Sequence, residues 1–225
     1  MKTKSNFIFV FLLVLVLTII FLAGCKKSAQ EQVEESITTE TEEVGKESIG
    51  LPAEIIWLFE KSANVKSMQY IYVSSVLVDN DKYKVKGNKI KVELMHMYRF
   101  NKTDYYDVVY LDTNEKKAKA YCELDRDCYA IKDREYEVGF AYYYRNTPLD
   151  WIEKLKNAKD FVKLNTELIE NKQSVHYSFT LENKSGEVWI WEYWGLPLKI
   201  ILNGKSYAFI GLAVNSLQDS DVVRG

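Results

Sequence analysis

Two cysteines lie close together in the segment 121–129, YCELDRDCY, where they could form a disulfide or bind a metal. A zinc site needs further Cys or His ligands, and the only histidines, His96 and His176, lie far from this segment in the sequence. An isolated, even pair of cysteines in an exported chain usually forms a disulfide. We therefore expect Cys122 and Cys128 to be bonded across a hairpin with its tip at 123–127, and we expect no metal site.

The remaining groups that could do chemistry form no catalytic pattern. His96 shares an alternating face with apolar residues and is expected in the core, whereas His176 lies on a polar face and is expected to be exposed. The acidic triplets 79–81 and 125–127 resemble turns, because neither has the glycine and distal glutamate of a calcium loop. The sequence contains no nucleophile elbow, P-loop, HExxH or Rossmann glycine pattern. We expect neither catalysis nor a cofactor.

A third cysteine, Cys25, ends an apolar run that covers 7–23 and follows the basic residues Lys2 and Lys4. These are the parts of a signal peptide. The junction Leu22-Ala23-Gly24-Cys25 resembles the lipobox of lipoprotein signal peptides, which implies that Cys25 is lipidated and becomes the new N-terminus. The alternative is an uncleaved anchor helix, for which the run is barely long enough. Either reading predicts an extracytoplasmic domain held at the membrane or cell envelope, with residues 1–24 as the signal peptide.

We predict that residues 25–50 form a disordered acidic tether. After Cys25 they contain seven Glu and three Lys, no aromatic residue and only isolated apolar residues, too few to form a packed core. Without the signal peptide and the tether, the 30 basic and 32 acidic residues of the chain fall to equal numbers. A neutral domain gives no reason to expect a nucleic-acid partner. Residues 51–225 are long enough for a single domain with its own core.

Most of this domain alternates between apolar and polar residues with a period of two, which predicts antiparallel strands joined by hairpins. Two segments instead have helical spacing. One covers 52–65. The other covers 148–158, where Thr147-Pro148-Leu149-Asp150 provides an N-cap, a first-turn proline and a capping acid. The expected strands are 68–79, 90–100, 105–112, 116–124, 128–132, 161–170, 173–182, 187–194, 198–202 and 206–214. The expected hairpin connections include 101–104, 182–186 and Asn203-Gly204.

Two of these connections carry Asn-x-Ser/Thr triplets, at Asn101 and Asn183. Both asparagines are expected to be exposed, and both could carry glycans in a host that glycosylates exported proteins.

The chain has 16 Tyr, 10 Phe and 5 Trp, which is a large aromatic content. Three of the tryptophans lie in 189–202, WIWEYWGLPLKIIL. Trp189 and Trp191 share one face of their strand and Trp194 takes the other, and we expect the first two to point inward. The run 141–144, AYYY, does not fit strand alternation. Ordinary packing at the edge of a sheet and a wall for a hydrophobic ligand both explain this aromatic surface.

The C-terminal part of the chain has a characteristic order of elements. A tryptophan-rich strand is followed by the turn Gly195-Leu196-Pro197-Leu198-Lys199, a further strand, Asn-Gly and a last strand. This order resembles the C-terminal half of LolA/LolB-like proteins, the lipoprotein carriers, and of related sensory domains. Upstream the resemblance lies in the order of helices and strands. It implies an α+β fold in which a strongly curved antiparallel sheet, a half-barrel, is covered by about two helices on its concave apolar face. The soluble carriers of that family are not lipidated, so the lipobox argues for a tethered binding protein and against a shuttle.

The resemblance further implies an apolar cavity for a lipid or a lipoprotein acyl chain beneath the helices, with the second helix as a lid. The residues expected to line it are Ile90, Val92, Leu94, Tyr98, Phe100, Trp151, Ile152, Leu155, Val175, Tyr177, Phe179, Leu181, Trp189 and Trp191. The alternative is a structural, interaction or sensory module of the envelope in which the same residues pack as a filled core.

Overall fold

The computed structural model describes residues 51–77, 80–125, 127–128, 131 and 133–224. All of them belong to one compact unit, Lys46–Gly225. The predictions about the signal peptide, Cys25 and the tether fall on residues outside this described part. Within it, no helix combines the length and the apolar character needed to cross a bilayer.

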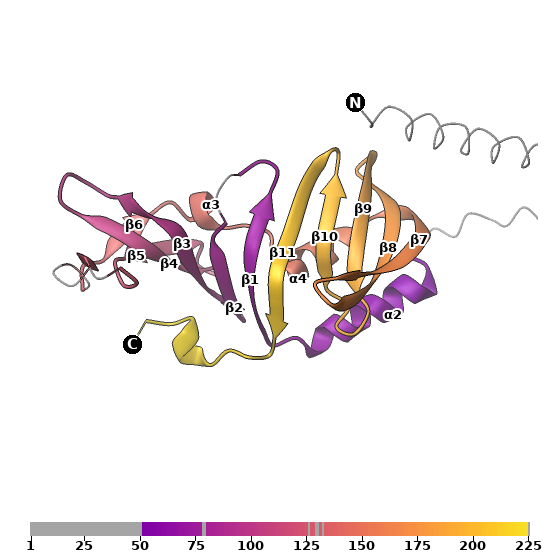
Figure 1. Ribbon diagram of the computed structural model, residues 1–225, viewed down its shortest axis with the longest axis horizontal. Helices are drawn as coiled ribbons and strands as arrows, with labels where there is room; N and C mark the ends of the chain where they lie inside the picture. The colour runs from indigo at the N-terminus through magenta and orange to yellow at the C-terminus, as the bar shows by residue number, and fades with distance from the viewer. Residues whose placement is uncertain (1–50, 78–79, 126, 129–130, 132, 225) are drawn as a thin grey trace, which may run out of the picture. The chain divides into compact units, whose positions relative to one another are not determined.

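An antiparallel sheet of eleven strands dominates the unit (Figure 1). The strands are β1 (Ser67–Ser74), β2 (Lys82–Lys86), β3 (Lys89–Arg99), β4 (Tyr105–Asp112), β5 (Lys117–Tyr121), β6 (Tyr136–Val138), β7 (Lys159–Ile169), β8 (Lys172–Leu181), β9 (Lys184–Trp191), β10 (Pro197–Leu202) and β11 (Lys205–Val214). Their order is β6-β5-β4-β3-β2-β1-β11-β10-β9-β8-β7, so the sheet is open and has β6 and β7 at its edges. Among the described strands, β1 and β11 are the one neighbouring pair that is not consecutive in the chain.

The tight hairpins depend on residues that tolerate left-handed backbone. Glu182 and Asn183, with φ of 51° and 60°, join β8 to β9, and Asn203 and Gly204, with φ of 51° and 72°, join β10 to β11. Two consecutive positive φ values are typical of the two-residue turns that match the twist of antiparallel strands. The Asn-Gly hairpin is therefore confirmed, and the turn predicted at 182–186 is shorter than expected.

The two predicted helices are present. Helix α2 (Ala53–Lys61) begins after Pro52 and buries Ile55, Leu58 and Phe59. Helix α4 (Pro148–Leu155) has the predicted capping box, in which the Thr147 hydroxyl accepts a hydrogen bond from the Asp150 backbone N–H and the Asp150 carboxylate accepts one from the Thr147 backbone N–H. It contacts β10 (Figure 1). Both helices and one face of the sheet contribute to the same hydrophobic core. We call this the inner face.

The strand predictions were wrong in several places. Strand β1 ends at Ser74 instead of 79, and β9 covers Lys184–Trp191 instead of 187–194, so Trp194 lies in the turn after the strand. The described residues of the strand expected at 128–132, Cys128 and Ile131, are not in a strand. Turn bonds run from the Cys128 N–H to the Asp125 carbonyl and from the Ile131 N–H to the Cys128 carbonyl. Strand β5 therefore pairs with β6, which sequence reasoning missed because it is three residues long. Strand β2 was also missed, since lysine occupies every second position of KYKVK and only Tyr83 and Val85 are buried.

Candidate functional site

The residues expected to line a cavity are largely brought together, but as packed core. Ten of them are buried in one cluster on the inner face and under α4, namely Ile90, Val92, Leu94, Trp151, Ile152, Leu155, Val175, Tyr177, Phe179 and Leu181. Tyr98 is partly buried against this cluster. Phe100 is 47% exposed, with its ring 4.6 Å from that of Tyr136 at the edge of the sheet. Whether the buried residues separate around a ligand stays a prediction.

The tryptophans do not point as expected. The pairing of β8 with β9 places Val188 opposite Tyr177 and Ile190 opposite Val175, so Val188 and Ile190 are the inward residues of β9. Trp189 lies opposite His176 on the other face of the sheet, which we call the outer face. Trp191 is partly buried at the end of the strand. Sequence reasoning chose the larger residues of this strand as core, whereas the structure buries the β-branched ones inside.

Trp189 belongs to a ladder of side chains across the outer face. The His176 ring stacks on it with the ring centroids 3.9 Å apart, and Lys199 Nζ lies 4.4 Å from the indole centroid on the neighbouring strand. The indole N–H donates to Glu167, and His176 Nε2 is 3.0 Å from a Glu187 carboxylate oxygen. His176 is therefore buried, contrary to its predicted exposure, because its neighbours on the outer face cover it.

His96 is also placed differently from the prediction. It is exposed together with Met95 and Met97. The pairing of β3 with β4 is irregular between Glu93 and Tyr98, so the alternation that buries Leu94 does not continue along the strand.

The tyrosine run 141–144 is explained by a helix instead of a strand. Helix α3 (Phe140–Tyr143) leaves Tyr142 77% exposed, while Tyr143 and Tyr144 turn toward the core. The Tyr83 hydroxyl donates to the Tyr143 carbonyl at 2.8 Å, and the Tyr144 hydroxyl donates to Asp150 at 2.8 Å. These bonds fix the segment that leads into α4.

Two buried donors beneath α4 have no protein acceptor among the described residues, the Tyr70 hydroxyl and the Trp151 indole N–H. Burial raises the pKa of Tyr70 well above its usual value, so the hydroxyl keeps its proton. A buried polar group without a partner costs free energy.

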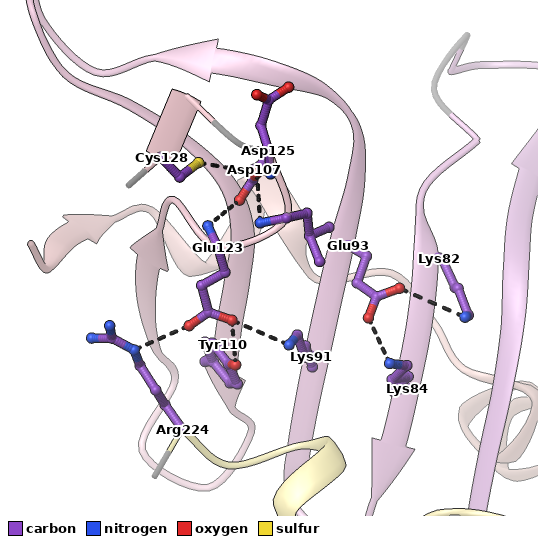
Figure 2. A network of polar contacts seen from close by, with 11 residues as sticks. Lys82, Lys84, Lys91, Glu93, Asp107, Tyr110, Glu123, Asp125, Cys128 and Arg224 are labelled. Carbon is purple, nitrogen blue, oxygen red and sulfur yellow. Dashed lines mark hydrogen bonds and ion pairs between the residues drawn. The ribbon is translucent and has the colours of Figure 1, made fainter. Parts of the chain in front are cut away.

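The cysteines form the predicted disulfide, with a Cα–Cα distance of 5.0 Å. Asp107 lies beside the disulfide, and its carboxylate and the two cysteine sulfurs fall within 4.8 Å of one another. These atoms do not form a metal site, because sulfurs in a disulfide do not offer thiolates to a metal. The Asp107 carboxylate instead accepts backbone N–H bonds from Glu123, Leu124 and Asp125 at 2.7–2.9 Å (Figure 2). It therefore holds the loop that the disulfide closes.

Next to this loop, Figure 2 shows a network of charges on the outer face. The Glu123 carboxylate accepts a hydrogen bond from the Tyr110 hydroxyl at 2.9 Å and pairs with Lys91 at 3.2 Å and with Arg224 at 3.0 Å. Burial and the Glu123 carboxylate raise the pKa of Tyr110. The network fastens the C-terminal segment to the sheet through Arg224.

An apolar groove opens between the two helices. Its volume is about 570 Å³, and its lining comes from one side of α2 with the residues that follow it and from one side of α4. The lining residues are Leu51, Ile56, Phe59, Glu60, Ser62, Ala63, Val65, Leu149, Glu153 and Lys156. Ile56 is 44% exposed although it is apolar. We call this the α2–α4 groove. Sequence reasoning missed it, because it treated each helix as having a single apolar stripe, toward the sheet.

The predicted glycosylation sites are both exposed. The Asn101 side-chain oxygen accepts the backbone N–H bonds of Thr103 and Asp104, each at 2.9 Å, and so forms the turn between β3 and β4. Modification of Asn101 and Asn183 stays a prediction.

No protein-family model and no curated protein matches the chain. Among solved structures, it is similar to MucB, with 12% identity over 76% of this chain and a TM-score of 0.47, and it spans 62% of the MucB chain. It is similar to lipoprotein LppX from Mycobacterium tuberculosis, with 12% identity, 74% of this chain and 96% of that chain covered, and a TM-score of 0.47. A LolA superfamily protein from Nitrosomonas europaea matches with 8% identity, 76% and 97% coverage and a TM-score of 0.29.

At identities of 8–12% and TM-scores of 0.29–0.47, the likeness supports no argument about this chain. It carries no ligand or partner over to this chain.

Proposed function

We propose that the protein is an extracytoplasmic lipoprotein, anchored through Cys25, that binds the acyl chain of a lipid or of another lipoprotein in the groove between α2 and α4. The observation that carries this proposal is the α2–α4 groove. Its volume of about 570 Å³ lies in the range of ligand sites, roughly 300–1,000 Å³. Each methylene buried there would contribute about 0.8 kcal/mol before the cost of association.

The predicted half-barrel shape fits this proposal. A curved sheet with its concave face under α2 and α4 would place the buried inner-face residues directly below the groove. A chain that enters the groove could then extend under α4 when the side chains packed there separate. The lining residues proposed from the sequence would form the deeper part of that path.

The test is a titration with a fluorescent fatty-acyl probe, using residues 46–225, which form one compact unit with its own core. Ala63 is an exposed lining residue, so Ala63→Trp should fill part of the groove and weaken binding at least tenfold. Ala53→Trp is the matched control, because Ala53 is exposed on α2 but does not line the groove. Binding that Ala63→Trp leaves unchanged would remove the groove from the proposal.

The packing of the inner face favours a second candidate. Val92 and Leu155 are fully buried and Tyr177 is 2% exposed, as expected of a filled core. If the wild-type domain binds no acyl probe and contains no lipid on extraction, the protein is an envelope interaction or sensory module instead.

A further inference from the structure

The charges around the α2–α4 groove indicate which head group its ligand carries. We propose that the groove takes an acyl or alkyl chain whose head group has no net negative charge and binds amine-bearing chains most tightly. This inference rests on the proposed function and specifies the ligand class for the same site.

Three charged residues line the groove, Glu60 from α2, Glu153 from α4 and Lys156 at the C-cap of α4. Lys156 Nζ lies 2.6 Å from a Glu153 carboxylate oxygen, so these two charges neutralise each other. Glu60 has no ion-pair partner among the described residues. The lining therefore presents one uncompensated negative charge to a bound head group.

Apart from Lys156, which pairs with Glu153, the described lining of the groove contains no cation. Lys61 lies next to Glu60 in the chain, but its Nζ donates to the Glu192 carbonyl at 2.6 Å and sits 3.4 Å from the centroid of the Trp57 ring. Lys163 of β7 pairs with Glu54 of α2 at 2.6 Å. Neither lysine belongs to the lining.

The one hydroxyl in the lining is also engaged. Ser62 donates to the Phe59 carbonyl at 2.6 Å. A carboxylate or phosphate head group would therefore lose water and meet Glu60 without gaining a charged or hydroxyl donor from the lining, whereas an ammonium group would gain an ion pair.

The expected discrimination is moderate because the groove opens to solvent. Two unit charges about 4 Å apart in water interact strongly enough to change an affinity by roughly fivefold, and salt screens this effect. Selection by the head group should therefore be visible at low ionic strength and weak at about 1 M salt.

The experiment uses three probes that share the same alkyl chain and differ in head group. Dodecylamine, dodecanol and dodecanoate each compete with a bound fluorescent acyl probe on residues 46–225. At low salt we expect dodecylamine to bind several-fold more tightly than dodecanoate, with dodecanol between them. Glu60→Gln should raise the affinity for dodecanoate and lower that for dodecylamine, so that the two converge. Glu137→Gln, which removes an exposed charge on the distant strand β6, is the matched control and should leave the ratio unchanged.

Equal affinity for the amine and the carboxylate at low salt, or a ratio that Glu60→Gln does not change, would overturn the head-group inference while leaving acyl binding intact. Failure of all three probes to bind would instead overturn the proposed function, and the inference with it. The two failures are distinguished because one concerns a ratio of affinities and the other concerns binding itself.

Discussion

Gly195 shows why the tryptophan-rich stretch ends as it does. Its φ is +66°, and a Cβ at this position would lie 1.8 Å from the carbonyl oxygen of Leu58 in α2. The glycine therefore has two roles, since it permits left-handed backbone and lets the helix approach the chain directly before β10. The Gly-Leu-Pro turn is thus also the place where α2 docks on the sheet.

We expect Gly195→Ala to be among the most destabilising single substitutions in this protein. The new methyl group would displace α2 and so disturb one wall of the groove, with an expected loss above about 4 kcal/mol in the free energy of unfolding. Gly204→Ala is the control, because Gly204 has φ of +72° but no atom lies within 4 Å of the position that a Cβ would take, so it should lose only about 1–2 kcal/mol. Urea titrations of both variants measure the difference. Equal losses would show that the approach of α2 is not tight.

Asp112 gives the protein a defined acid sensitivity. Its carboxylate accepts hydrogen bonds from Lys89, from the Glu115 and Asn114 backbone N–H groups and from Asn88, and these lower its pKa from 3.8 to about 2. A lowered pKa in the folded state stabilises the fold above the unfolded pKa, and this contribution disappears as the pH falls through the folded pKa.

We therefore expect the stability of the wild-type protein to fall between pH 4 and pH 2 in part through Asp112. Asp112→Asn should reduce stability at neutral pH and flatten this part of the pH dependence. Urea midpoints measured from pH 2 to pH 6 provide the test. An unchanged slope in the variant would mean that Asp112 is not linked to folding.

At the scale of elements, the loop after β5 is held twice, by the disulfide and by Asp107. The chain-entropy model assigns about 2 kcal/mol to a ring of this size. The double variant Cys122→Ser/Cys128→Ser should therefore lose about that amount of stability and still fold, because the Asp107 bonds remain. Urea unfolding with and without a reducing agent measures it. A wild-type protein that reductant does not destabilise, or a double variant that does not fold, would contradict this account.

The sequence predicted those elements whose signals are local. The helix at α4 has Thr147 and Asp150 at capping positions, and the β10–β11 hairpin has Asn203-Gly204, so both were placed correctly. Strand β2 was missed, because its lysines lie on the outer face, where Lys84 pairs with Glu93 of β3 at 2.6 Å. Pairing of this kind depends on a neighbouring strand and has no signature within the strand itself.

The faces of strands and helices were harder to predict than their existence. The alternation of the sequence showed that Trp189 and Ile190 point in opposite directions. Which of the two points inward depends on the register of their strand with β8. The groove depends in the same way on how two helices face each other across Phe59 and Leu149. Such tertiary relations are not encoded in the periodicity of a single segment.

At the scale of the whole molecule, the proposed lipid anchor at Cys25 would determine where the domain works. We expect Cys25→Ser to abolish lipidation and to change how the protein is held, because a single acyl chain binds membranes only weakly and stable anchoring needs more than one. Cell fractionation combined with mass spectrometry of the N-terminal peptide tests this. A variant that stays membrane-bound like the wild type would favour an uncleaved anchor helix.

The strand order has a consequence for how the chain could be divided. Strands β1–β6 and β7–β11 each form a continuous meander, and the two meet along the pairing of β1 with β11. A break in the segment between β6 and β7 would leave every hairpin intact and cut only the α3–α4 connection. Two separately made fragments should therefore reassemble through this seam and through the contact of α2 with Gly195. Because that seam joins the most distant parts of the sequence, its closure should also be the slowest step in folding.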